Sequence, residues 1–213
     1  MAQEYIEELI GRMSKKEDRL TSSDESVRWK ACREAEKLKD PIFYSILKEF
    51  ILSHSKPKEK EMRDSAYFIL GKLLLNTPLD EYIAFFLECL EKENDKYILS
   101  QMLDRISNLT IPAEFSVKPI IALALNDRWQ IRQSAIRALG ASATAESIEM
   151  LAYYINQTDT KAYKYEIEYA NAALGRIGTE KDIYLLEQHT TSRMRDIRET
   201  AKFAIERIKS RTP

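Results

Sequence analysis

Apolar residues recur along most of the chain at spacings of three and four, the period of a helix that buries one face. In the segment PLDEYIAFFLECLEK, for example, Ile83, Phe86, Leu87 and Leu90 fall on one face. The polar stretches between such runs are short, as in ENDK and NQTDTK. The pattern predicts helices at about 4–13, 24–38, 41–54, 60–75, 78–93, 95–107, 113–126, 128–140, 145–157, 162–177, 180–190 and 194–209.

A short motif recurs along these predicted helices. The segments SAYFILG, SAIRALG and YANAALG each place an Ala four residues before a Leu and five before a Gly. The same register passes through anchor positions 31, 66, 101, 135, 170 and 201, at intervals of 35, 35, 34, 35 and 31 residues. Because one helix pair cannot bury its apolar stripe alone, we expect the pairs to stack around a continuous core. This predicts one domain over 1–213, with units at about 4–38, 41–75, 78–107, 113–140, 145–177 and 180–209.

The stretch DRWQIRQSAIRALG, residues 127–140, is the most complete copy of the motif. It resembles the second helix of a HEAT repeat, in which an Asp, an Arg about five residues later, and an Ala precede a Leu-Gly ending. Here these are Asp127, Arg132, Ala135 and the pair 139–140. The period is shorter than the ~40–47 residues of most such repeats, so the chain is most similar to short bacterial HEAT-like repeats. The resemblance implies an all-α, right-handed α-α superhelix of about six antiparallel helix pairs.

The copies differ in informative ways. The third unit has Gln101 at the anchor, and the fifth has Ile167 where the Arg is expected. We expect the anchor Ala residues to let helices approach closely, and the Gly after Leu to end a helix in the left-handed conformation. Pro119 leaves two alternatives open: it kinks its helix, or the helix starts at Val117.

The composition agrees with a folded helical protein. The chain is 44% hydrophobic and 31% charged, with five Gly and six Pro in 213 residues, which is too apolar for a disordered chain. The net charge of −1 lacks the basic excess of a dedicated nucleic-acid binder. The start of the chain is acidic and unlike a signal peptide, and no apolar run approaches the ~18 residues of a membrane span. With only two cysteines, we expect a cytoplasmic protein without a disulfide framework.

Signs of catalysis are weak. His54 and His189 are the two histidines, far apart and without Cys partners. The sequence contains no P-loop, GxSxG or HExxH motif. We therefore predict no catalytic, cofactor-binding or metal-binding residues, and a protein that is not an enzyme.

Four arginines occupy the repeat position three before the anchor: Arg28, Arg63, Arg132 and Arg198. A residue that recurs with the repeat is expected to serve the architecture, pairing with acidic residues of its own or a neighbouring unit as a ladder. The alternative is a positive stripe that contacts phosphates. The acidic residues in the same helices favour the ladder.

The HEAT resemblance implies that the second helices line a concave face. Trp, Tyr and Arg are enriched at binding hot spots, so we expect partner contacts at Trp29, Asp64, Arg137, Tyr165, Glu168, Tyr169 and Arg176. Tyr165 and Tyr169 are one turn apart and should share a face. Trp129, near a helix start, is expected to pack or cap. In 127–140, Ile131, Ala135 and Leu139 should be core, and Gln130, Gln133, Ser134 and Arg137 should face the groove.

Two functions follow as hypotheses. The first is a non-enzymatic scaffold that holds a protein or peptide in the groove of the solenoid; its oligomeric state is left open. The alternative is a nucleic-acid-binding protein resembling the HEAT-like glycosylases that excise alkylated bases from DNA. That resemblance implies a basic channel with Trp and a catalytic Asp, for which Trp29, Trp129 and Asp64 match in residue type alone. Nucleic acid and membrane partners are therefore not expected.

Overall fold

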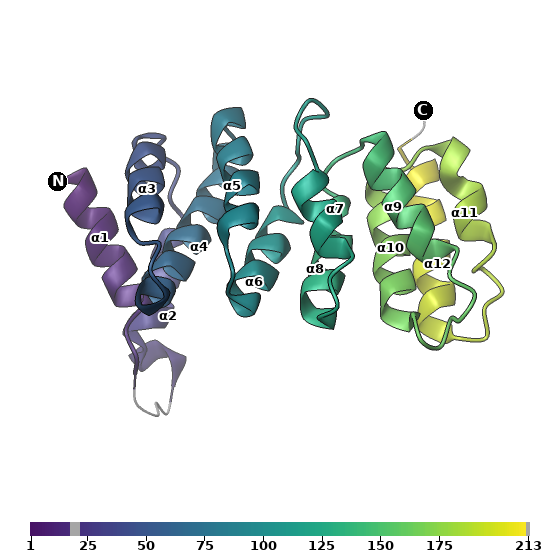
Figure 1. The fold of residues 1–213 in the computed structure, drawn as a ribbon, viewed down its shortest axis with the longest axis horizontal. Coiled ribbons are helices and arrows are strands. Elements are labelled where there is room, and N and C mark those ends of the chain that lie inside the picture. Colours follow the sequence, from purple (N-terminus) through teal and green to yellow (C-terminus); the bar gives the residue numbers. More distant parts are fainter. Residues whose placement is uncertain (18–21, 212–213) are drawn as a thin grey trace. The chain divides into compact units, whose positions relative to one another are not determined.

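The computed structural model describes residues 1–17 and 22–211, and all regular structure in these residues is helical. The fold is therefore all-α, as predicted (Figure 1). The α-helices are α1 (Ala2–Met13), α2 (Val27–Ala35), α3 (Ile42–Ser53), α4 (Lys60–Asn76), α5 (Asp80–Lys92), α6 (Lys96–Ile106), α7 (Lys118–Ala124), α8 (Trp129–Leu139), α9 (Ala145–Ile155), α10 (Lys164–Ile177), α11 (Ile183–Glu187) and α12 (Arg195–Lys209). Short 3₁₀ helices at Ser23–Glu25, Pro57–Glu59 and Glu180–Asp182 precede α2, α4 and α11.

The predicted helices are present, with three clearly shorter than expected, the first of which is α2, with 27–35 against the predicted 24–38. α7 begins at Lys118, because the chain turns over 113–117, and α11 is a single turn and a half after its 3₁₀ helix. Pro119 lies in the first turn of α7, with Val117 as the N-cap. Of the two alternatives, the helix start at Val117 is therefore confirmed and the kink at Pro119 is wrong. The missing N–H of Pro119 costs little in the first turn of a helix. The predicted loop 14–23 lies partly outside the described residues.

The chain comprises two compact units, residues 1–86 and 87–213. In the first unit α1 packs on α2, α3 and α4, and α3 packs on α4. Its core contains Ile6, Leu9, Tyr44, Leu47 and Leu70, all with no exposed surface. The single domain over 1–213 stays a prediction.

The second unit has two layers of helices. The second helices α6, α8, α10 and α12 pack one against the next, while α7, α9 and α11 each pack on the second helix of their own pair. Buried residues along α8 include Ile131, Ala135 and Leu139, which confirms their predicted place in the core. None of the described helices is both long and apolar enough to cross a lipid bilayer.

The anchor positions are confirmed with one exception. Ala residues at 31, 66, 135, 170 and 201 have no exposed surface. In α6, however, Gln101 is exposed and Met102 is fully buried. The register of the third unit is therefore one residue later than the sequence spacing predicted, because a Met side chain fills the position that Ala occupies elsewhere.

The expected left-handed glycines are wrong. None of the described residues has a positive φ, and Gly140 ends α8 with φ −68°. A Cβ on Gly140 would lie 3.0 Å from the Cα of Ala173, and one on Gly175 would lie 2.8 Å from the Cα of Ala204. The Gly after Leu is thus needed for close approach between successive second helices, rather than for a left-handed turn.

Candidate functional site

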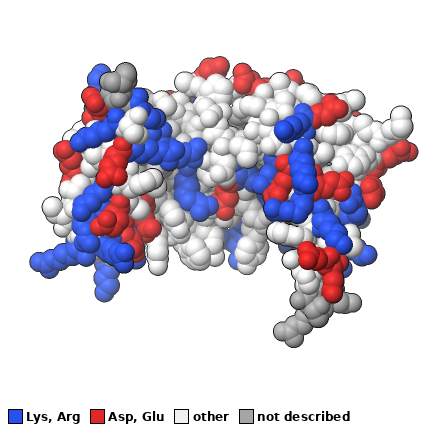
Figure 2. Space-filling view, turned by 180° about the vertical axis from the view of Figure 1, so that it is seen from behind, with Lys and Arg blue, Asp and Glu red and all other residues white. Residues whose placement is uncertain are grey.

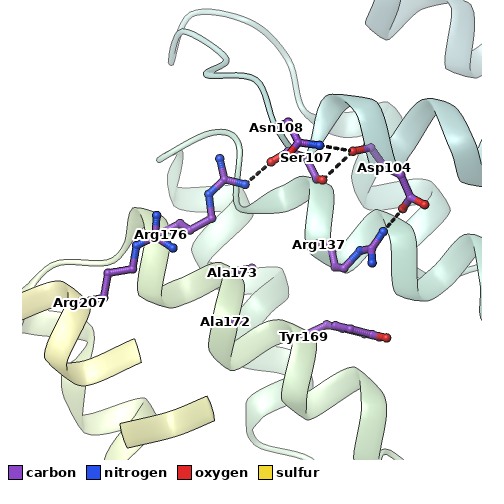
Figure 3. Close-up of a pocket in the computed structure, with 9 residues that line it drawn as sticks. All are labelled: Asp104, Ser107, Asn108, Arg137, Tyr169, Ala172, Ala173, Arg176 and Arg207. Carbon is purple, nitrogen blue, oxygen red and sulfur yellow. Dashed lines mark hydrogen bonds and ion pairs between the residues drawn. The ribbon is translucent and has the colours of Figure 1, made fainter. Parts of the chain in front are cut away.

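Three predicted contact residues meet in one pocket of the second unit. Arg137 of α8 and Tyr169 and Arg176 of α10 line a cavity of about 410 Å³ on the layer of second helices (Figure 3). We call it the second-helix pocket, and its lining is Asp104, Ser107, Asn108, Arg137, Tyr169, Ala172, Ala173, Arg176 and Arg207. The repeat places these residues together because α6, α8, α10 and α12 present equivalent positions side by side.

At one end of the pocket, the guanidinium of Arg137 lies between the carboxylate of Asp104 and the ring of Tyr169. Arg137 donates from Nη2 to the Oδ1 of Asp104, and its Cζ lies 5.5 Å from the ring centre of Tyr169. The two charged side chains are 40% and 43% exposed, so water screens the pair and it contributes about 0–1 kcal/mol. The Nε of Arg137 is buried and has no hydrogen-bond partner within the part of the chain that the structure describes. The side chain of Arg137 therefore contributes little to the stability of the fold.

At the other end two arginines come together. Arg176 donates from Nη1 to the carbonyl oxygen of Ser107, reaching from α10 past α8 to the end of α6 (Figure 3). Burial lowers the pKa of Arg176, and the charge of Arg207 on α12 lowers it further. Among the described contacts, neither arginine forms an ion pair with a carboxylate. Positive charge is thus concentrated where α10 and α12 end.

The other predicted residues of α10 lie outside this pocket. Tyr165 is 54% exposed, with the Nζ of Lys164 located 5.2 Å from its ring centre. Lys164 pairs with Asp196 of α12 at 2.6 Å. Burial raises the pKa of Glu168, and the nearby charge of Asp196 adds to the effect. Of the two predicted tyrosines, only Tyr169 therefore lines the second-helix pocket.

The remaining predicted residues belong to the first unit. Trp29 is 43% exposed, and the Cζ of Arg33 lies 4.3 Å from its ring centre. Trp29 lines a separate hollow of about 450 Å³, with Tyr5, Asp24, Lys30, Arg33, Glu34, Lys37 and Leu38. Asp64 is half-buried on α4. These residues are described within their own unit, and their placement in a common groove with the second-helix pocket stays a prediction.

Glu34 organises the polar side of this hollow. It accepts a hydrogen bond of 2.7 Å from the Oη of Tyr5 and is paired with Arg12 at 2.8 Å. The hydrogen bond from Arg12 holds the pKa of Glu34 below its ordinary value. Burial and the bond to Glu34 raise the pKa of Tyr5 to about 12.

Most of the arginines at the recurring repeat position donate hydrogen bonds to backbone carbonyl oxygens of the loop before their helix. Arg132 donates to the carbonyl oxygens of Asn126 and Asp127 at 2.9 and 3.0 Å, and its Nη2 pairs with Glu166 of the next unit at 2.9 Å. This confirms an inter-repeat pair at that position. Arg63 and Arg198 also donate to carbonyl oxygens of the loops that precede their helices. At Arg63, Arg132 and Arg198 the arginine therefore holds the loop that enters its helix, a role that is not shown for Arg28.

Trp129 contradicts its expected packing role. It is the first residue of α8 and is 58% exposed, and the N-cap residue is Arg128. Of the residues in 127–140 expected to face the groove, Ser134 is buried and shares a 3.0 Å hydrogen bond with Ser100, so it is structural. Gln130 and Gln133 are half-buried. Arg137 alone of that group lines the pocket.

The sequence reasoning missed Asp104 as a contact residue. With the corrected register, Asp104 lies two residues after Met102, as Arg137 lies two residues after Ala135. Equivalent positions of neighbouring repeats are adjacent, so the pair between Asp104 and Arg137 follows from the register. The even spacing of the repeats places the anchor at Gln101, whereas the buried residue is Met102.

Both histidines have structural roles. The ring of His54 stacks on Phe50, and its Nδ1 is 2.8 Å from the carbonyl oxygen of the same residue. His189 is buried, with Nε2 at 2.8 Å from the carbonyl oxygen of Ile155. Over residues 1–17 and 22–211, no three His, Cys, Asp or Glu side chains are grouped so that they could hold a metal ion.

No protein-family model and no curated protein matches the chain. Several solved structures, however, are similar to it. A designed armadillo repeat protein in complex with the peptide (KR)4 has a TM-score of 0.53, 12% identity, and coverage of 95% of this chain and 99% of that one. A computationally designed armadillo repeat protein for modular peptide recognition has a TM-score of 0.50, 13% identity, and the same coverage. AlkD2 from Streptococcus mutans covers 96% of this chain and 97% of its own, with 14% identity and a TM-score of 0.41.

The likeness to armadillo repeat proteins identifies the fold. Together with the helix order and the stacking of second helices, it shows that the chain is an α solenoid of helical repeats. At these identities the comparison carries the fold alone, so function has to be argued from the pocket.

Proposed function

We propose that this protein is a non-enzymatic, cytoplasmic scaffold that binds a protein or peptide segment along its second helices. Within this proposal the repeats are of the short bacterial HEAT-like kind. The binding surface includes the second-helix pocket and, next to it on α10, Tyr165 and Glu168. Within the first unit, we propose Trp29 and Asp64 as partner contacts in their own right.

The observation that carries the proposal is the end of the pocket built by Asp104, Arg137 and Tyr169. Its ring and guanidinium are half-exposed and held loosely, since the Arg137 pair is screened and its Nε has no partner. Tyr and Arg in a concave site are the residue types that carry most binding energy in protein interfaces. A bound segment would bury them at little cost to the fold. The designed armadillo protein in complex with a peptide is a solenoid of the same kind.

The charge distribution favours a peptide over nucleic acid. On the face shown in Figure 2, Lys and Arg side chains of the described residues are interspersed with Asp and Glu. A phosphate backbone needs a continuous basic surface, and its binding falls steeply with salt. Within the pocket, Asp104 pairs with Arg137 at one end, so the remaining positive charge is confined to the other end.

The test is selection from a phage library of random peptides on the full-length protein. We expect enriched sequences whose binding is lost when Arg137→Ala and Tyr169→Ala are combined. The matched control combines Lys118→Ala with Tyr153→Ala, which removes one cation and one exposed tyrosine from the first helices α7 and α9. Equal loss in both variants, or no enrichment at all, would contradict the proposal. Retention of duplex DNA with a steep salt dependence would support the nucleic-acid alternative instead.

A further inference from the structure

Two positive side chains of the second-helix pocket are left over after internal pairing. Arg137 pairs with Asp104, whereas the side chain of Arg176 donates to the carbonyl oxygen of Ser107. Arg207 is exposed, and within the described residues its side chain forms no hydrogen bond or ion pair. Yet the charge of Arg207 is close enough to lower the pKa of both Arg176 and Arg211. Arg176 and Arg207 thus lie together as like charges, while Asp104 of the same pocket pairs with Arg137.

Helix ends account for these arginines only in part, although Arg176 and Arg207 both lie in the last turn of their helices. Cations near helix C-termini are stabilised by the dipole and by unpaired carbonyl groups. Arg211 has this role, because it donates to the carbonyl oxygens of Gly175 and Gly178 at 2.6 and 2.8 Å at the end of α10. Arg207 donates to neither. The dipole of α12 favours a cation at this position, but it does not account for a side chain placed beside that of Arg176 in the pocket (Figure 3).

Resting on the proposed function, we propose that Arg176 and Arg207 bind a Glu or Asp side chain of an acidic peptide segment, whose neighbouring residue packs on Tyr169. Two guanidinium groups offer forked donors that match the two oxygens of a carboxylate. The bound carboxylate also removes the repulsion between the two arginines. The ring of Tyr169 lies in the same pocket, beside Arg137, so the segment is held at two points.

A peptide carboxylate suits this site better than a nucleic-acid backbone does. The unpaired positive charge is confined to the junction of α10 and α12, and the opposite end of the pocket carries Asp104. A single acidic side chain needs one such point, while phosphates spaced along a strand need several. The acidic side chain enters between Arg176 and Arg207, and Asp104 stays with Arg137.

The experiment measures fluorescence anisotropy of labelled (Glu-Tyr)4, (Lys-Tyr)4 and (Ser-Tyr)4 peptides with the full-length protein at low salt. One variant combines Arg176→Gln with Arg207→Gln. Its control combines Arg193→Gln with Arg195→Gln, which removes the same charge from exposed arginines just before and at the start of α12. Arg195 lies twelve residues before Arg207, about 18 Å along the helix, and neither control residue lines the pocket.

We expect (Glu-Tyr)4 to bind best, and the pocket variant to weaken it at least about tenfold while the control changes it less than about twofold. Equal weakening in both variants would overturn the inference, because overall charge would then explain binding. Preferential binding of (Lys-Tyr)4 that is lost on Tyr169→Ala would also overturn it, yet would leave the proposed peptide-binding function standing. Binding of duplex DNA and of no peptide would overturn both.

A stability measurement separates a binding role from a structural one. If Arg207 serves a ligand, removing its charge relieves repulsion with Arg176, so Arg207→Gln should keep or raise the melting temperature. A clear drop in melting temperature for Arg207→Gln, with unchanged (Glu-Tyr)4 affinity, would show that Arg207 stabilises the fold and would overturn the inference.

Discussion

The ion pair between Arg132 and Glu166 should be the most stabilising polar contact of the second unit. Glu166 is 3% exposed and accepts from the Nε and Nη2 of Arg132 at 3.0 and 2.9 Å. Arg132 also holds the loop before α8 through two carbonyl oxygens. Its substitution by Ala leaves a buried carboxylate without a counter-charge and releases the loop.

The expected loss follows from these contacts. Breaking a buried pair costs about 3–5 kcal/mol, and partial hydration through the exposed part of Arg132 brings this to about 3 kcal/mol for Arg132→Ala. The matched control is Arg198→Ala, at the same repeat position. Arg198 donates to one loop carbonyl, and its partner Glu199 is 55% exposed. Arg198→Ala should therefore lower the free energy of unfolding by about 1 kcal/mol.

The assay is urea unfolding of full-length protein carrying Trp29→Phe, so that fluorescence reports on Trp129 at the start of α8. Adding Glu166→Gln to Arg132→Ala should restore part of the lost stability, because a buried amide needs no counter-charge. Equal losses for Arg132→Ala and Arg198→Ala, together with no rescue by Glu166→Gln, would refute the reasoning. The position would then act through loop pinning alone.

Three further predictions follow from packing, burial and charge. Gly175→Ala should lower the stability of the protein by about 1–3 kcal/mol in thermal unfolding, because its Cβ would lie 2.8 Å from the Cα of Ala204. The control Gly11→Ala in α1 places its Cβ where nothing lies within 4 Å, so it should raise the stability by about 0.5–1 kcal/mol. A stabilising effect of both substitutions would contradict the close approach of α10 and α12. The pKa of Glu34 is held below its ordinary value of 4.5, mainly by Arg12, so its stabilisation is present above that value and lost as pH falls through the lower, folded pKa. Acid unfolding followed by circular dichroism should therefore be less steep for Glu34→Gln, and an unchanged profile would argue against this linkage. Tyr154→Phe should cost about 1–2 kcal/mol in urea unfolding, because the Oη of Tyr154 donates to the carbonyl oxygen of Ala124 at 2.6 Å in a buried site; a neutral effect would show that water reaches this carbonyl.

Most of the fold could be predicted from the period of the sequence repeat. Helix spacing and the buried Ala anchors located the helix pairs, because the same packing requirement recurs in each unit. The α6 register was missed because Met102 fills the Ala position and leaves Gln101 exposed. The role of the Leu-Gly glycines was missed because close helix contact and a left-handed helix end favour the same residue. Only their surroundings, Ala173 and Ala204, distinguish the two.

The site was less predictable than the fold. Arg137, Tyr169 and Arg176 were found because their repeat positions face outward from the second helices. The third arginine position, Arg207, shares that face, but its neighbours decide its role. Whether an arginine is paired, as Arg137 is with Asp104, or unpaired, as Arg207 is, depends on side chains from other repeats. Residue spacing within one helix does not contain that information.

The central claim, peptide binding in the second-helix pocket, is tested most directly by NMR of the full-length protein titrated with (Glu-Tyr)4. We expect chemical-shift changes centred on Arg137, Tyr169, Ala172 and Arg176, with the Nε–H signals of Arg176 and Arg207 moving most. Shift changes that are absent there, or that centre on the first helices α7, α9 and α11, would contradict it.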